Sequence, residues 1–140
     1  MLYGRAVVVS SAQLFSTVPA HDYLQFWQAG RFQPQRVVRF LGLSKEEVAQ
    51  VAGVAVSSVR FDRKAPRDLT DRLSEIAATC TLVAQFFDGN AIKTALWFKA
   101  ANPLMGDVSP REMIRAGRHG EVRRFVMEAV KEAPAGSRDV

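Results

Sequence analysis

The sequence predicts an all-α fold, and three observations carry this prediction. Apolar residues recur at the 3.6-residue spacing of a helix along residues 69–87. Two segments begin with Ser-x-x-Glu, the capping box that starts a helix. Glycine or proline separates most of the apolar segments from one another. We therefore expect a chain built from helices, with no sheet of three or more strands.

The size and composition are those of one globular domain. The chain has 140 residues, of which 48% are apolar and 24% are charged, which excludes a disordered, collagen-like or disulfide-rich chain. No apolar run approaches the ~20 residues that a membrane-spanning helix needs. The first residues lack the basic start and apolar length of a signal peptide, and one cysteine cannot form an internal disulfide. A cytoplasmic location without membrane contact is expected.

The residues that most enzymes and metal sites require are scarce. Two histidines, His21 and His119, and one cysteine, Cys80, cannot build a zinc cluster. The glycine-rich phosphate-binding motifs, G-x-S-x-G and H-E-x-x-H are absent, and no nucleophile–base pair is evident. We therefore expect a protein that is not an enzyme and holds no metal or cofactor. The net charge of +5 favours an acidic partner, either nucleic acid or an acidic protein surface.

Residues 1–35 are predicted to form an N-terminal arm with a short helix. The apolar residues 6–9 fit either a short strand or part of an ordered arm. The closely spaced apolar residues of 21–29 predict the short helix. The next helix is expected over residues 36–41, with Pro34 near its start, where proline is well tolerated.

Residues 36–68 carry the pattern of a helix-turn-helix domain. The first capping box, Ser44 to Glu47, predicts a helix over residues 45–52. A turn at Gly53 separates it from a second helix expected near residues 56–61. In such a motif the second helix enters the major groove of DNA, so operator DNA is an expected partner.

The crossing of these two helices depends on residue types at fixed spacing. A small residue, a glycine in the turn and an apolar anchor are needed, and Ala49, Gly53 and Val59 occupy those positions. One position departs from the pattern, because Asp62 stands where an apolar residue is expected and Phe61 is one place early. The alternative is an ordinary pair of core helices with a solvated basic surface. The expected DNA-binding residues are Ser57, Ser58, Arg60, Arg63, Lys64 and Arg67.

The second half of the chain opens with its longest predicted helix. It covers residues 70–87, with Thr70 as its cap and Cys80 on the buried stripe, where a thiol is inert. The next helix is expected over residues 91–100. Within it, Trp97 and the adjacent Phe98 cannot share one face, so one should pack in the core and the other can lie in an interface.

The last elements are two short helices and a tail. The second capping box, Ser109 to Glu112, predicts a helix over residues 110–116. A final helix is expected over residues 120–131, and residues 132–140 form a flexible C-terminal tail. His119 lies between glycines and is expected in a surface loop.

The segment from Trp97 to Gly117 carries an ordered series of residues. A tryptophan is followed by Asn-Pro-Leu, a glycine, Ser-Pro, an apolar pair and a second glycine. This series resembles the toxin-binding domain of the MbcA/ParS/Xre antitoxin family, and the resemblance covers about residues 36–131. It implies a toxin-binding domain over residues 69–131 that includes the connecting helix 70–87. The residues that match the series are Trp97, Asn102, Pro103, Leu104, Gly106, Ser109, Pro110, Met113, Ile114 and Gly117.

The resemblance implies a cytoplasmic type II antitoxin whose partner is a RES-domain toxin that consumes NAD. Members of the family occlude the active site of the toxin, typically dimerise, and often repress their own operon. Arginines of the last helices would meet acidic residues at the rim of the toxin pocket: Arg111, Arg115, Arg123 and Arg124. The tail, with Arg138, would enter that pocket, where Asp139 and the terminal carboxylate could mimic phosphates. The alternative function is a stand-alone helix-turn-helix regulator whose C-terminal block only dimerises.

Overall fold

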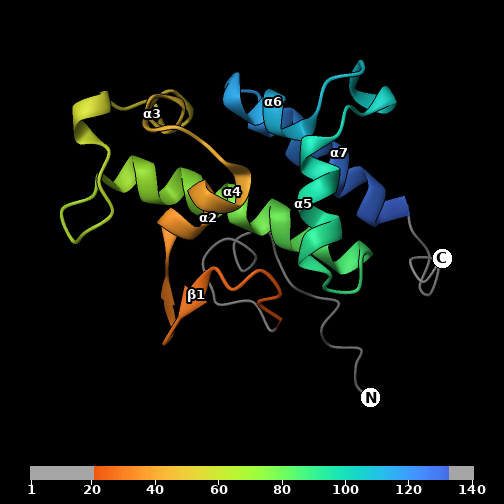
Figure 1. The fold of residues 1–140 in the computed structure, drawn as a ribbon, viewed down its shortest axis with the longest axis horizontal. Helices are drawn as coiled ribbons and strands as arrows, with labels where there is room; N and C mark the ends of the chain where they lie inside the picture. The colour runs from red at the N-terminus through yellow and green to blue at the C-terminus, as the bar shows by residue number, and fades with distance from the viewer. Residues whose placement is uncertain (1–20, 133–140) are drawn as a thin grey trace.

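The computed structural model describes residues 21–132, and helices dominate this part of the chain (Figure 1). The predicted all-α class is confirmed there, since the described strands form one hairpin of two short strands. The elements in chain order are β1 (Trp27–Gln28), β2 (Arg31–Phe32), α2 (Pro34–Leu41), α3 (Lys45–Ala52), the 3₁₀ turn η2 (Val56–Ser58), α4 (Arg67–Phe86), α5 (Ala91–Lys99), the 3₁₀ turn η3 (Pro103–Met105), α6 (Pro110–Arg115) and α7 (His119–Glu132).

Helix α4 is the centre of the arrangement. The helices α2, α3, α5 and α7 all pack against it, and α6 packs against α3, α5 and α7 (Figure 1). The apolar stripe predicted from sequence is its buried face, with Leu69, Leu73 and Cys80 fully buried. Burial raises the pKa of the Cys80 thiol, because an apolar environment disfavours the thiolate. The expectation of an inert core cysteine is therefore confirmed.

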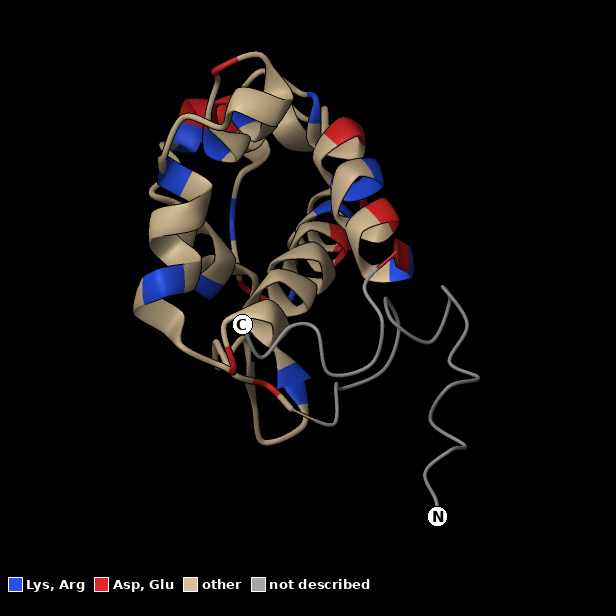
Figure 2. Cartoon of the chain, turned by 90° about the vertical axis from the view of Figure 1, so that its right-hand side faces the viewer, with Lys and Arg blue, Asp and Glu red and all other residues tan. Residues whose placement is uncertain are grey.

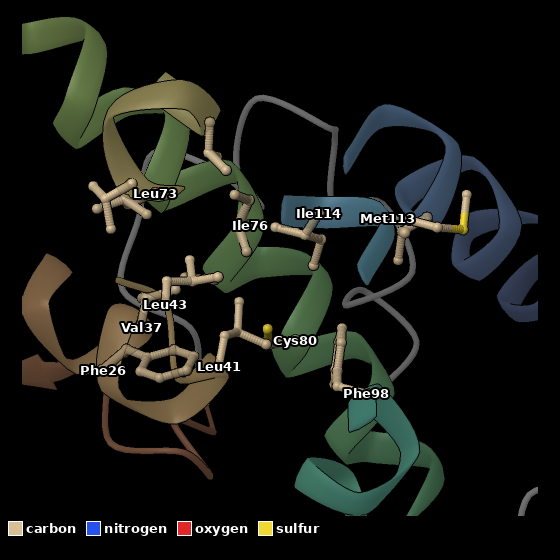
Figure 3. Close-up of a cluster of buried hydrophobic side chains, with 14 of the residues drawn as sticks. Phe26, Val37, Leu41, Leu43, Leu73, Ile76, Cys80, Phe98, Met113 and Ile114 are labelled. Carbon is tan, nitrogen blue, oxygen red and sulfur yellow. The ribbon is translucent and has the colours of Figure 1, made fainter. Parts of the chain in front are cut away.

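One hydrophobic core joins the two halves of the chain. Leu41 from α2 and Leu43 lie beside Leu73 and Cys80 of α4, and Phe98 and Ile114 extend the same cluster toward the C-terminal helices (Figure 3). The cluster thus continues without interruption across the predicted boundary between residues 68 and 69.

The short helix predicted over residues 21–29 is wrong, because this segment leads into the β1–β2 hairpin. The Asp22 carboxylate accepts hydrogen bonds from the backbone N–H groups of Phe26 (3.0 Å) and Trp27 (2.9 Å). Ala29 and Gly30 both have positive φ, as a two-residue hairpin turn requires. The Trp27 ring then packs on that of Phe32, with centroids 5.5 Å apart. The hydrogen bonds to Asp22 and the aromatic contact across the hairpin therefore favour this turn over the helix that the apolar spacing predicts.

The predictions for α2 and α3 are confirmed. Helix α2 begins at Pro34, two residues before the predicted start. Helix α3 has the predicted bounds, and its capping box is complete. The backbone N–H of Glu47 donates to Ser44 Oγ (3.1 Å), and the backbone N–H of Ser44 donates to Glu47 Oε1 (2.8 Å).

The α-helix predicted near residues 56–61 is wrong. Only the 3₁₀ turn η2 forms there, and residues 59–66 connect it to α4 without helical structure. The Asp62 carboxylate explains the break, because it accepts from the Arg60 side chain and from the backbone N–H of Lys64 (3.0 Å). Pro66 in addition disfavours a helical conformation at the residue before it.

The remaining helices confirm their predictions with small differences at the ends. Helix α4 begins at Arg67 with Pro66 at the cap position, so Thr70 does not cap it as predicted. Helices α5 and α6 end one residue before the predicted bounds, and α7 extends one residue beyond them at each end. The second capping box is half formed: Ser109 Oγ accepts from the backbone N–H of Glu112 (3.0 Å), while the Glu112 carboxylate pairs with Arg115.

Some predictions fall on residues outside the described part. These are the strand or arm at residues 6–9 and the tail from residue 133 onward, including Arg138 and Asp139. Within residues 21–132, no helix combines the length and the apolar character that crossing a membrane requires.

Helix α6 is held against the N-terminal half by two arginines. The Arg111 guanidinium donates from Nε to the carbonyl of Leu41 and from Nη2 to that of Gly42 (2.6 Å), at the C-terminal end of α2. Helix ends leave such carbonyls without intrahelical partners, so a cation there is favourable. One turn further along, Arg115 pairs with Glu47 of α3 and with Glu112.

We predict that Arg111→Met lowers the free energy of unfolding by about 1.5–3 kcal/mol, the range for hydrogen bonds made by a charged group. The two carbonyls of Leu41 and Gly42 lose their donor. Chemical denaturation followed by circular dichroism measures the change. The control is Arg124→Met, which removes an exposed arginine from α7. An equal loss of stability in the two variants would contradict the prediction.

Candidate functional site

Helix α5 presents three different faces. Thr94 and Phe98 are fully buried and hold it against the core. Trp97 is half-buried, and its ring is stacked on that of Phe125 in α7, with centroids 6.4 Å apart. Ile92 and Leu96, four residues apart and so neighbours on the helix surface, are 75% and 62% exposed. The sequence-based expectation that one of the two adjacent aromatics packs in the core is confirmed by Phe98.

The turn that follows α5 exposes a third large apolar side chain. Leu104, in η3, is 79% exposed. Six large apolar residues of the described chain are exposed, and three of them fall within residues 92–104. Single exposed apolar residues are normal on a protein surface, whereas a contiguous apolar area marks an interaction site, and Ile92 and Leu96 are neighbours on the surface of α5. We call Ile92, Leu96 and Leu104 the exposed apolar set.

The charged side chains of α5 itself have one sign, whereas the exposed Asp88 and Asp107 lie just before and just after residues 91–106. Residues 91–106 include Lys93 and Lys99 and contain no acidic residue. Both lysines are exposed, and Figure 2 shows basic but no acidic residues along α5. An apolar set flanked by positive charge suits a partner surface that is apolar at its centre and acidic at its edge.

The residues of the Trp97–Gly117 series mostly shape the backbone. Asn102 Oδ1 accepts from the backbone N–H of Leu104 (2.9 Å), and the Asn102 backbone pairs with Val108 in an isolated bridge. Pro103 begins η3 and Gly106 ends it. Ser109 caps α6, and Pro110 is its buried first residue. These contacts close a small loop over residues 102–108 and leave Leu104 exposed on it.

The predicted rim arginines are divided between α6 and α7. Arg111 and Arg115 contact the ends of α2 and α3, so either would have to give up these bonds to reach a partner. Arg123 and Arg124 lie on α7. Both of these residues are exposed. Structural contacts of this kind were not foreseen, because they join residues about 70 positions apart in the sequence.

The predicted DNA-binding residues lie on η2, on the connection to α4 and at the start of α4, rather than on a recognition helix. Arg60 is paired with Asp62, and the Arg60 side chain lowers the pKa of that carboxyl. Arg67 lies 3.8 Å from Asp71 in α4. Arg63 and Lys64 are exposed. Ser57 is exposed and Ser58 is half-buried in η2.

A groove between α4, α5 and α7 is the feature that the sequence reasoning missed. Its volume is about 260 Å³, and each lining side chain from residues 21–132 is apolar. The walls come from three helices and the turn after α4: Val83, Phe86, Phe87, Trp97, Phe125, Val126 and Ala129. The only signal in the sequence was that either Trp97 or Phe98 could lie in an interface, which indicated neither the groove nor its other walls.

His119 is not in a surface loop, as had been expected. It is the first residue of α7, and its side chain is 20% exposed. Its Nδ1 atom is buried and has no hydrogen-bond partner among the described residues, while Nε2 lies 3.9 Å from Glu75 Oε1. Burial lowers the pKa of His119, and the positive charges of Arg72 and Arg123 lower it further. The negative charge of Glu75 opposes this shift.

Comparison of the chain with protein-family models, curated proteins and solved structures found no match. The described His, Cys, Asp and Glu residues form no group of three that could hold a metal ion. The candidate binding site rests on the exposure of Ile92, Leu96 and Leu104 alone.

We predict that the free energy of unfolding falls as the pH is lowered through 6.5, the ordinary pKa of His119. The folded-state pKa lies below that value, so the unfolded chain binds more protons in this range and gains stability relative to the fold. Denaturation curves collected across the range measure the effect. His119→Gln should flatten the pH dependence, whereas the same change at exposed His21 should leave it in place. An unchanged pH profile for His119→Gln would refute the prediction.

Proposed function

We propose that this protein binds another protein through the exposed apolar set and acts as the antitoxin of a RES-domain toxin. The observation that carries the binding role is the exposure of Ile92, Leu96 and Leu104 beside a face of α5 that is firmly packed. The toxin is the partner that the Trp97–Gly117 series implies through its resemblance to the MbcA/ParS/Xre antitoxin family. A cytoplasmic homodimer is part of the same proposal.

The packing of α5 supports a preformed binding surface. Phe98 is fully buried and anchors the helix, so Leu96 is presented without a rearrangement of the backbone. A preorganised surface loses less conformational entropy on association than a mobile one. In the complex, the three apolar side chains would leave water, and Lys93 and Lys99 would face acidic residues at the edge of the interface. Occlusion of the toxin pocket then needs no chemistry from the antitoxin.

We predict that Leu96→Asp weakens binding to the RES-domain toxin by at least about 30-fold, which corresponds to about 2 kcal/mol, the threshold for an interface hot spot. A charge would be buried at the centre of the interface. Co-purification with the neighbouring gene product and rescue of growth measure the loss. The control is Val56→Asp, which places the same charge at another exposed apolar position, on η2. If the two variants bound the toxin equally well, or if both failed to bind it, the exposed apolar set would be removed from the proposal.

A second candidate function is DNA binding by the basic segment over residues 60–67, as in autorepression or in a stand-alone regulator. It is favoured by the exposure of Arg63 and Lys64. Because η2 is a single 3₁₀ turn, it offers no recognition helix that could read bases. The structure therefore supports only contacts between the basic segment and DNA phosphates. A regulator without a toxin partner would keep this activity and fail the co-purification.

We predict that the protein shifts promoter DNA in a gel at low salt and that Arg63→Ala with Lys64→Ala weakens the shift on all sequences. Each lost phosphate contact should lower the slope of log affinity against log salt by about 1. Titrations at several salt concentrations give the slope. Arg118→Ala, which removes an exposed arginine paired with Glu121, serves as the charge control. Without any shift at low salt, the DNA-binding role fails and protein binding alone remains.

A further inference from the structure

The groove between α4, α5 and α7 is apolar on every wall. Its lining includes the rings of Phe86, Phe87, Trp97 and Phe125. Among the described residues, no charged or hydrogen-bonding side chain contributes to it apart from the indole N–H of Trp97. Its volume of about 260 Å³ is large enough to admit more than one apolar side chain. The chemistry of the walls therefore selects an apolar occupant without charge.

The described chain begins at one end of this groove. Tyr23 packs over Gly89, in the turn between α4 and α5, so closely that a Cβ atom at Gly89 would lie 2.5 Å from the ring. Gly89 also has a φ of +82°, which a side chain would strain. His21 stacks on Tyr23, with ring centroids 5.5 Å apart. Phe86 and Phe87, two walls of the groove, immediately precede this turn.

The residues just before His21 have the composition that the groove selects. Leu14, Phe15 and Val18 are apolar, and no charged residue occurs between Arg5 and His21. His21 is six positions after Phe15, a separation that can span up to about 20 Å when the chain is extended. The chain after Glu132 is a poorer match, because its Arg138 and Asp139 would find no countercharge on the walls.

We infer that the groove is the docking site of the chain's own N-terminal segment, residues 14–18, with Phe15 as the main side chain inserted. In this arrangement the segment covers the Trp97 face of α5 and leaves Ile92 and Leu96, on another face, for a partner. Burial of three apolar side chains against aromatic walls supplies the driving force. This inference does not depend on the proposed antitoxin function.

A nitroxide at position 13 tests the docking in the full chain. Cys80 is the only native cysteine and is buried, so Gln13→Cys provides one accessible thiol for the label. We expect the label to broaden the methyl signals of Val83, Val126 and Ala129 in the groove and to spare Val48 and Val51 of α3. Reduction of the nitroxide should restore the broadened signals.

Matched variants separate the docking from its alternatives. Phe15→Ser in the labelled chain should abolish the broadening, whereas Tyr3→Ser, the same kind of change outside the segment, should not. Unchanged signals of the α3 methyls verify that both variants fold. Sharp groove signals in the labelled chain would overturn the inference. So would broadening in an isotope-labelled copy mixed with an unenriched nitroxide-bearing copy, because the segment would then dock on a second molecule. Groove signals that change only when the toxin is added would likewise assign the groove to that partner.

Discussion

The burial of α4 is the constraint on which the other elements depend. This helix of 20 residues buries Leu69, Leu73 and Cys80 completely, and four helices cover it. A helix with so wide an apolar surface is stable only while its neighbours keep water away from it. The helices α2 and α3 from the first half of the chain and α5 and α7 from the second half all pack against it. The part predicted to be a helix-turn-helix and the part that carries the exposed apolar set therefore share one core.

Much of the fold could be predicted because local signals and tertiary packing agree along it. The Ser44 capping box fixed the start of α3, and the spacing from Leu69 to Val83 gave α4. Prediction failed where one side chain redirects the backbone. Asp22 caps the turn before the hairpin, and Asp62 binds both Arg60 and a backbone N–H. An aspartate that bonds to nearby backbone competes with the helix, and apolar periodicity does not register this competition.

The candidate site was predictable only in part, for a related reason. Leu104 was among the expected binding residues and is exposed, whereas Ile92 and Leu96 were not among them. Their exposure depends on which face of α5 packs against the core. Phe98 fixes that face through its ring contacts with Phe40 and Trp97. Arg111 shows the opposite case. Its sequence position suggests a surface charge, but the fold brings the C-terminal end of α2 to it.

The buried thiol of Cys80 can report on transient separation of the helices that pack around α4. The side chain is fully enclosed on the central helix, and its raised pKa keeps it in the unreactive protonated form. A thiol reagent can reach it only in molecules whose helices have separated from α4. The rate of thiol modification under native conditions therefore measures how often the helices separate from α4. Oxidants that act on accessible thiols leave the closed molecule unchanged.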